Sequence, residues 1–287
     1  MSASSSDSAL KTGFGAALCH DPALVGGVAV ALMLGTYGLF GVPVDVPIVI
    51  AGFCGTTLTY LLDRGWADPP EDRVNRPGRV AWVRAHPCWL AAEMGLLFAL
   101  GGAMGFYLAP STLVWGGALG LVAGGHVVRR GQQAGALRWV PKPVVLAGAW
   151  AVGGVLLPLV EAGRPLGGEA LLFCGYRGAF ILPNLLLADW ADRDGDAAAG
   201  LTPWAEGWTI RQVRWAATAS LLVAGGAAMG WGTVGAAPVL VAIDAIGLPL
   251  MAGVVWGPDP ERPRSLLLAD LVVAWPLVPA IVAWMSL

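Results

Sequence analysis

Long apolar runs separated by short polar loops dominate the pattern along the chain. Each run holds about 18 to 22 residues, the length that one helix needs to cross a hydrocarbon core about 30 Å thick. Barrel strands would instead alternate in polarity over about ten residues, and the chain shows no such alternation. The pattern therefore predicts an all-α polytopic membrane protein with nine transmembrane helices, over residues 22–41, 43–62, 87–108, 110–128, 144–161, 168–188, 213–233, 235–256 and 265–286.

The composition supports this class. Of the 287 residues, 56% are hydrophobic and 13% are charged, whereas a soluble domain has about 25% charged residues. The opening "MSASSSDSAL" lacks the basic start and cleavage site of a secretory signal, so we expect residues 1–21 to form a disordered tail before one domain over 22–287. The four cysteines are scattered, which indicates neither a disulfide framework nor a thiolate metal site. No nucleic-acid partner is expected.

The basic residues predict the orientation of the helices. When the N-terminus is placed in the cytoplasm, 15 of the 17 Lys and Arg residues fall in the tail or in the loops after helices 2, 4, 6 and 8. Arg164 lies on the other side, and Arg177 lies inside the sixth helix. Because basic loops stay on the cytoplasmic side, we expect a cell inner membrane protein whose N-terminus and even-numbered loops are cytoplasmic.

Acidic residues gather in two of these loops, which together hold nine of the 19 Asp and Glu residues. In "LLLADWADRDGDAAAGLTPW", residues 185–204, four aspartates follow a membrane-type run within eight residues. If the sixth helix continues, Asp189, Asp192 and Asp196 lie within about 60° of one another and Asp194 points to the opposite side. Three carboxylates on one face repel each other, and Mg²⁺ completed by water and a substrate phosphate would neutralise them. The plainer alternative is a solvated loop.

The other acidic loop reads "YLLDRGWADPPEDRVNRPGR", residues 60–79. Asp68 and Asp72 are four residues apart, while the paired prolines between them make an uninterrupted helix unfavourable. The arginines that follow suit phosphate because guanidinium presents a fork of donors. The loop is therefore able to bind Mg²⁺ and diphosphate together, or to form a self-neutralising network of salt bridges.

The two acidic loops resemble the aspartate-rich motifs of the UbiA-type superfamily of intramembrane prenyltransferases, which read roughly NDxxDxxxD and DxxDxxxD. Asp189-x-x-Asp192-x-x-x-Asp196 matches the second motif. The first is matched in part, through Asp68-x-x-x-Asp72 and the "DRVNRP" that follows. The resemblance covers residues 22–287 and implies nine helices around a central cavity.

The resemblance also implies a reaction, in which Mg²⁺ neutralises the diphosphate of an isoprenyl donor and the prenyl group passes to a lipophilic acceptor. Where the family often carries a Tyr-x-x-x-Lys that grips the diphosphate, this chain has His126 and Arg130. The metal-binding and catalytic positions are then Asp68, Asp72, Asp189, Asp192 and Asp196. The substrate-binding positions are Asp63, Arg73, Arg76, His126, Arg130 and Lys142.

Two alternatives stay open. A terpene cyclase of the same fold would quench the cation within its own chain, and a lipid-binding or transport protein would carry out no chemistry. Arg177 and Asp244 lie inside predicted helices, each about 16–18 Å from the cytoplasmic end at 1.5 Å per residue. Intramembrane charges normally pair or face a cavity, so the matching depth predicts a salt bridge that is either structural or functional.

Overall fold

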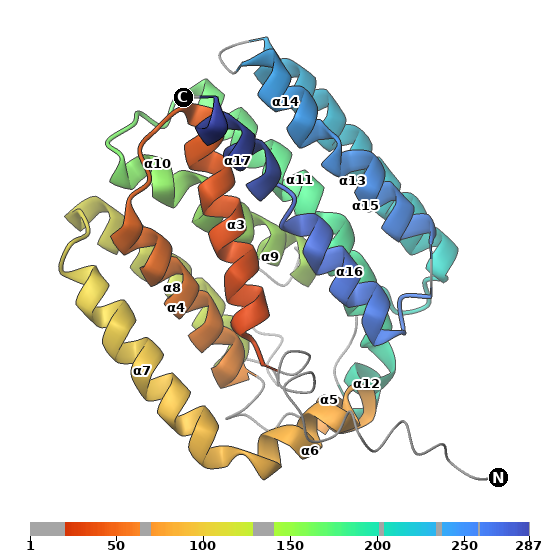
Figure 1. Cartoon of the computed structure of the whole chain (residues 1–287). Helices are drawn as coiled ribbons and strands as arrows, with labels where there is room; N and C mark the ends of the chain where they lie inside the picture. Colours follow the sequence, from red (N-terminus) through yellow and green to blue (C-terminus); the bar gives the residue numbers. More distant parts are fainter. Residues whose placement is uncertain are drawn as a thin grey trace.

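The computed structural model describes residues 21–63, 70–128, 141–200, 204–233, 237–257 and 259–286. Within these ranges the chain is all-α and contains no strand. The helices run almost the whole length of the described chain (Figure 1). They are α3 (Ala23–Phe40), α4 (Val46–Leu61), α5 (Pro70–Asn75), α6 (Pro77–Ala85), α7 (Pro87–Gly105), α8 (Pro110–Val128), α9 (Lys142–Ala151), the π-helix η3 (Val152–Leu156), α10 (Leu157–Glu161), α11 (Gly168–Ala191), α12 (Arg193–Ala198), α13 (Ile210–Gly232), α14 (Pro238–Ala245), α15 (Gly247–Trp256), α16 (Pro263–Val273) and α17 (Leu277–Met285).

Each of the nine predicted ranges contains one helix or a succession of shorter ones. Six helical stretches in the described chain are long and apolar enough to cross a membrane, namely Ala23–Phe40, Pro87–Gly105, Lys142–Glu161, Gly168–Ala191, Pro238–Trp256 and Ser265–Met285. Two shorter apolar helices, Val46–Leu61 and Pro110–Val122, correspond to two further ranges, and α13 covers the range 213–233 up to Gly232. The six stretches indicate an integral membrane protein.

Proline and local hydrogen bonds set many of the helix ends. Six helices of the described chain begin at a proline, namely α5, α6, α7, α8, α14 and α16. Proline fits the first turn of a helix because the N–H groups of that turn have no partner within the helix. At α4 the Asp45 side chain accepts a hydrogen bond from the Ile48 N–H at 3.0 Å, and at α13 Thr209 and Gln212 form a capping box. Helix α3 ends at Gly41, whose φ of 59° favours glycine.

Close packing of small residues holds the bundle together around α11 and α3. Helix α11 packs against α9, α13 and α16, and α3 packs against α4, α17 and η3. A Cβ added at Gly38 would lie 2.6 Å from the Ala280 backbone, so the approach of α3 to α17 requires glycine there. The Ser220 hydroxyl donates to the Ala179 carbonyl at 2.7 Å and joins α13 to α11.

Several apolar stretches are interrupted inside the bundle. A π-helical turn lies between α9 and α10, α14 passes into α15 at Ile246, and α16 is separated from α17 by residues 274–276. The Trp275 indole donates to the Ile243 carbonyl at 2.9 Å, and thus links the two C-terminal interruptions. Beside them, Arg177 Nη2 lies 2.9 Å from Asp244 Oδ1, with both side chains 1% exposed. The predicted salt bridge is confirmed.

Candidate functional site

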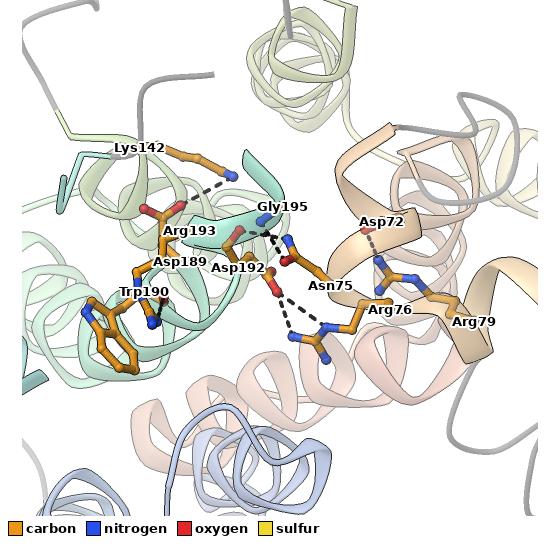
Figure 2. Close-up of polar contacts among 10 residues, drawn as sticks. All are labelled: Asp72, Asn75, Arg76, Arg79, Lys142, Asp189, Trp190, Asp192, Arg193 and Gly195. Atoms are coloured by element: carbon orange, nitrogen blue, oxygen red, sulfur yellow. Dashed lines mark hydrogen bonds and ion pairs between the residues drawn. The ribbon is translucent and has the colours of Figure 1, made fainter. Parts of the chain in front are cut away.

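The two acidic segments converge at one end of the bundle, where α5 and α12 pack together (Figure 1). The Asn75 side chain joins them: its Nδ2 donates to the Asp192 carbonyl at 2.7 Å, and its Oδ1 accepts from the Gly195 N–H at 2.9 Å. Arg76 at the end of α5 forms an ion pair with Asp192, with Nη2 3.0 Å from Oδ1 (Figure 2). Segments more than 110 residues apart in sequence therefore form one surface.

The second acidic motif spans the junction of α11 and α12. The condition that the helix continues through the motif is not met, because α11 ends at Ala191, Asp192 is its C-cap and α12 starts at Arg193. The Asp192 carbonyl is shared between the Asp196 N–H and the Asn75 amide, which places the junction against α5. The Asp194 side chain is 75% exposed, whereas Asp189 and Asp196 are buried.

Basic side chains from neighbouring helices form ion pairs with the acidic side chains. Lys142, the first residue of α9, places Nζ 3.4 Å from Oδ1 of the buried Asp189 (Figure 2). In the first acidic segment Arg79 forms an ion pair with Asp72, and both side chains are largely buried. Part of the negative charge is thus neutralised by the protein itself, as the salt-bridge alternative anticipated for the first loop.

Asp196 carries unfavourable charge in this arrangement. Its side chain is buried, and no ion pair to it is formed within the described ranges. Burial raises the pKa of the Asp196 carboxyl from 3.8 to about 6; Lys142 lowers it, and the charges of Asp189, Asp192 and Glu71 raise it. The Lys and Arg side chains of the cluster therefore do not fully neutralise the negative charge around Asp196.

An elongated cavity of about 520 Å³ opens beside the cluster. Its walls come from α3, α4, α7, α8, the α9–α10 stretch and α11, and glycines from four of these helices line it. Four charged residues share one end of the cavity, which we call the charged mouth: Asp63, Lys142, Asp189 and Asp192. Ligand sites typically combine an apolar lining with a few convergent polar groups, and this cavity has that form.

The structure places the predicted site residues in three groups. Asp63, Lys142, Asp189 and Asp192 line the cavity, and Asp72, Arg76 and Asp196 lie in or beside the contact of α5 with α12. Arg73 lies on α5 with an exposed side chain. His126 belongs to α8, but its side chain, like Asp68 and Arg130 as a whole, falls outside the described part of the protein.

The described carboxylates fit a metal ion only if a substrate completes its coordination. Among the described residues, no three His, Cys, Asp or Glu side chains are arranged as a metal-binding group. Mg²⁺, however, usually binds through one or two carboxylates together with water and substrate phosphate. Asp189 and Asp192 at the charged mouth supply two carboxylates, and the raised pKa of Asp196 indicates that added positive charge is favourable nearby.

Asn75 and Gly195 are the functional positions that sequence reasoning missed. A Cβ at Gly195 would lie 2.3–2.5 Å from the Asn75 amide atoms, so only glycine allows this approach. The signal was weak: Asn75 falls within "DRVNRP", and Gly195 lies between two aspartates of the second motif. Neither residue is ionisable, and their pairing depends on the docking of α5 against α12.

The geometry of this site is the basis for assigning a function. The cluster combines carboxylates with Lys and Arg side chains beside a mainly apolar cavity at one end of a helical bundle. Comparison of the chain with protein-family models, with curated proteins and with solved structures found no match.

Proposed function

We propose that the protein is a Mg²⁺-dependent intramembrane prenyltransferase, similar to the UbiA type, that ionises an isoprenyl diphosphate and transfers the prenyl group to a lipophilic acceptor. One observation carries the proposal: Lys142, Asp189 and Asp192 meet at the mouth of a mainly apolar cavity of about 520 Å³. A diphosphate needs cations and a prenyl tail needs an apolar wall, and both lie within this one cavity. Two aspartates of the second acidic motif, Asp189 and Asp192, line this mouth.

The chemistry begins with heterolysis of the bond between C1 of the prenyl chain and the diphosphate oxygen. The electron pair leaves with the diphosphate. Lys142, which lines the cavity, and Arg76, which pairs with the lining residue Asp192, would donate to the diphosphate oxygens. Mg²⁺, when held by Asp189 and Asp192 and by the second-motif residue Asp196, would supply further positive charge to the leaving group. The allylic cation then bonds to a nucleophilic atom of the acceptor, which loses a proton to water or to a carboxylate of the mouth.

Two aromatic rings lie on the cavity wall close to the charged mouth. Tyr60 and Trp150 both line the cavity, and their ring centroids are 6.4 Å apart. Tyr60 precedes Asp63 by about one helical turn. Aromatic faces attract cations, so these rings are suited to stabilise an allylic cation near the position where the diphosphate leaves.

The membrane arrangement is part of the proposal. We place nine spans in the cell inner membrane, with the N-terminus and the loops that carry α5, α6 and α12 on the cytoplasmic side. The gathering of these three short helices at one end supports this orientation (Figure 1), as does the bias of basic residues. Labelling of single introduced cysteines with a membrane-impermeant reagent tests it, with position 78 expected to react from the cytoplasm.

The enzymatic test uses purified protein in liposomes that contain membrane lipid extract as the source of acceptor. With Mg²⁺ and geranylgeranyl diphosphate, we expect diphosphate release and a prenylated lipid detectable by mass spectrometry. The double variant Asp192→Asn/Asp196→Asn should reduce release by at least about 100-fold, since it removes two carboxylates that would hold charge at the leaving group. Asp194→Asn is the matched control, because this neighbour is exposed and should retain activity.

A transporter is the second candidate. The buried Arg177–Asp244 pair lies beside interrupted helices, an arrangement common at transporter binding sites. A transporter would move labelled isoprenyl diphosphate across liposomes without cleaving it and would tolerate the Asp192 and Asp196 changes. A terpene cyclase would release diphosphate and form a hydrocarbon product even when no acceptor is present.

A further inference from the structure

The cavity is long in the direction of its helices. Along α4 its lining extends from Ile48 to Asp63, and along the α9–α10 stretch from Leu157 to Lys142. Each of these stretches covers 15 residue steps, which at 1.5 Å per residue gives a depth of about 22 Å. The two independent helices agree on the depth, and the charged mouth lies at the same end of both.

Packed hydrophobic side chains line the far end of the cavity. Met33, Ile48 and Leu157 are all buried members of one hydrophobic cluster, and Leu108 packs against that cluster. All four residues also line the cavity, and we call them the floor. A chain that enters from the charged mouth therefore meets a solid end.

We infer that this cavity selects the length of the isoprenoid donor, with a limit of about four isoprene units set by the floor. The inference rests on the proposed function and specifies its donor. Each unit adds four carbon–carbon bonds of about 1.5 Å in a zigzag, or about 5 Å of extended chain. Four units thus fill the depth between the charged mouth and the floor.

Gly55 on α4 marks an intermediate level of the cavity. It lines the cavity eight residues before Asp63, about 12 Å from the mouth at 1.5 Å per residue. A Cβ at Gly55 meets no atom within 4 Å, so a side chain there has open space to occupy. A leucine at this level leaves room for about two isoprene units. At Gly52, by contrast, an added Cβ would lie 2.4 Å from the Met33 side chain, so a larger side chain there would collide with Met33.

The test compares donors of two, three, four and six units, namely geranyl, farnesyl, geranylgeranyl and hexaprenyl diphosphate. For the unchanged protein with Mg²⁺, kcat/KM for diphosphate release should rise up to four units and fall at least about tenfold at six. Gly55→Leu should retain activity on two units and lose at least about tenfold on four. Gly27→Leu is the matched control, because Gly27 is an exposed α3 glycine with nothing within 4 Å of its added Cβ and is not part of the cavity wall.

A second variant changes the limit in the other direction. Leu157→Ala removes part of the floor, so it should raise the relative kcat/KM for six units over four, and it keeps the test decisive if Gly55→Leu does not fold. An unchanged length profile in the two cavity variants overturns the inference and leaves the proposed function standing. No diphosphate release from any donor, with the protein shown to be folded, overturns the proposed function and the inference with it.

Discussion

Replacement of Asn75 by alanine is the sharpest test of how the two acidic segments are held together. The amide of this residue makes two hydrogen bonds that join α5 to the α11–α12 junction, at 2.7 and 2.9 Å, beside the Arg76–Asp192 ion pair. Each bond is expected to contribute about 1 kcal/mol net, and a buried donor left unsatisfied costs about 1–3 kcal/mol. Gly195, whose N–H loses its Asn75 partner, is buried, whereas the Asp192 carbonyl keeps the Asp196 N–H at 3.1 Å.

These terms predict that Asn75→Ala lowers the free energy of unfolding by about 2–3 kcal/mol. The measurement is urea unfolding in detergent, followed by tryptophan fluorescence. Val74→Ala is the control: Val74 is the preceding residue on the same short helix, its side chain is 54% exposed, and its loss should change stability by less than about 0.5 kcal/mol.

Gly195→Ala probes the same contact from the other segment. Its Cβ would overlap the Asn75 amide, so the cost of the double variant should be clearly smaller than the sum of the two single variants. The reasoning is refuted if Asn75→Ala is as stable as Val74→Ala, or if the effects of Asn75→Ala and Gly195→Ala simply add.

Two further predictions concern buried charge. Because the pKa of Asp196 is raised from 3.8 to about 6, its ionisation costs nothing below pH 3.8 and about 3 kcal/mol above pH 6. The unchanged protein therefore loses stability as pH rises through this window. In EDTA, Asp196→Asn should be more stable than the unchanged protein at pH 7.5 by up to that amount, and should show no gain near pH 4. The same difference between variant and unchanged protein at both pH values contradicts this prediction. Arg177→Met should lower the free energy of unfolding by about 3–5 kcal/mol, because it leaves Asp244 buried and unpaired. The double variant Arg177→Met/Asp244→Leu should recover most of this loss in the same unfolding assay. An equal loss in both variants contradicts the pairing argument.

Apolar run length predicted where the helices lie but not where they break. A run of about 20 apolar residues is long enough for one span whether or not its helix is continuous. The interruption at Ile246 depends on tertiary packing: a Cβ at Gly247, the next residue, would lie 3.0–3.2 Å from the Trp275 and Phe180 rings. Such neighbours are distant in sequence, so no local pattern identifies them.

The site was predictable to the extent that it depends on helical periodicity and on depth in the bilayer. The exposure of Asp194 beside the buried Asp189 and Asp196 agrees with the separation that 100° per residue suggested. The Arg177–Asp244 pair followed from their equal distance to the predicted cytoplasmic ends of their helices. The pairing of Lys142 with Asp189 did not follow, because it requires α9 and α11 to start and end at the same level. The contact of Asn75 with Gly195 likewise depends on the docking of a six-residue helix.

Under the proposed function, the basic side chains at and beside the mouth explain how an acidic surface would accept a diphosphate. Arg76 is already paired with Asp192 and Lys142 with Asp189, while Asp196 remains buried with a raised pKa. A divalent cation and a diphosphate that enter together add charges of opposite sign, so the cation relieves Asp196 while the diphosphate shares Lys142 and Arg76. A diphosphate alone would compete with the carboxylates for the Lys142 and Arg76 side chains.

Binding of geranylgeranyl diphosphate should therefore require Mg²⁺ in the unchanged protein. This requirement should weaken in Asp192→Asn/Asp196→Asn, where the competing negative charge is gone. Equal affinity with and without Mg²⁺ in the unchanged protein would contradict this account of the cluster.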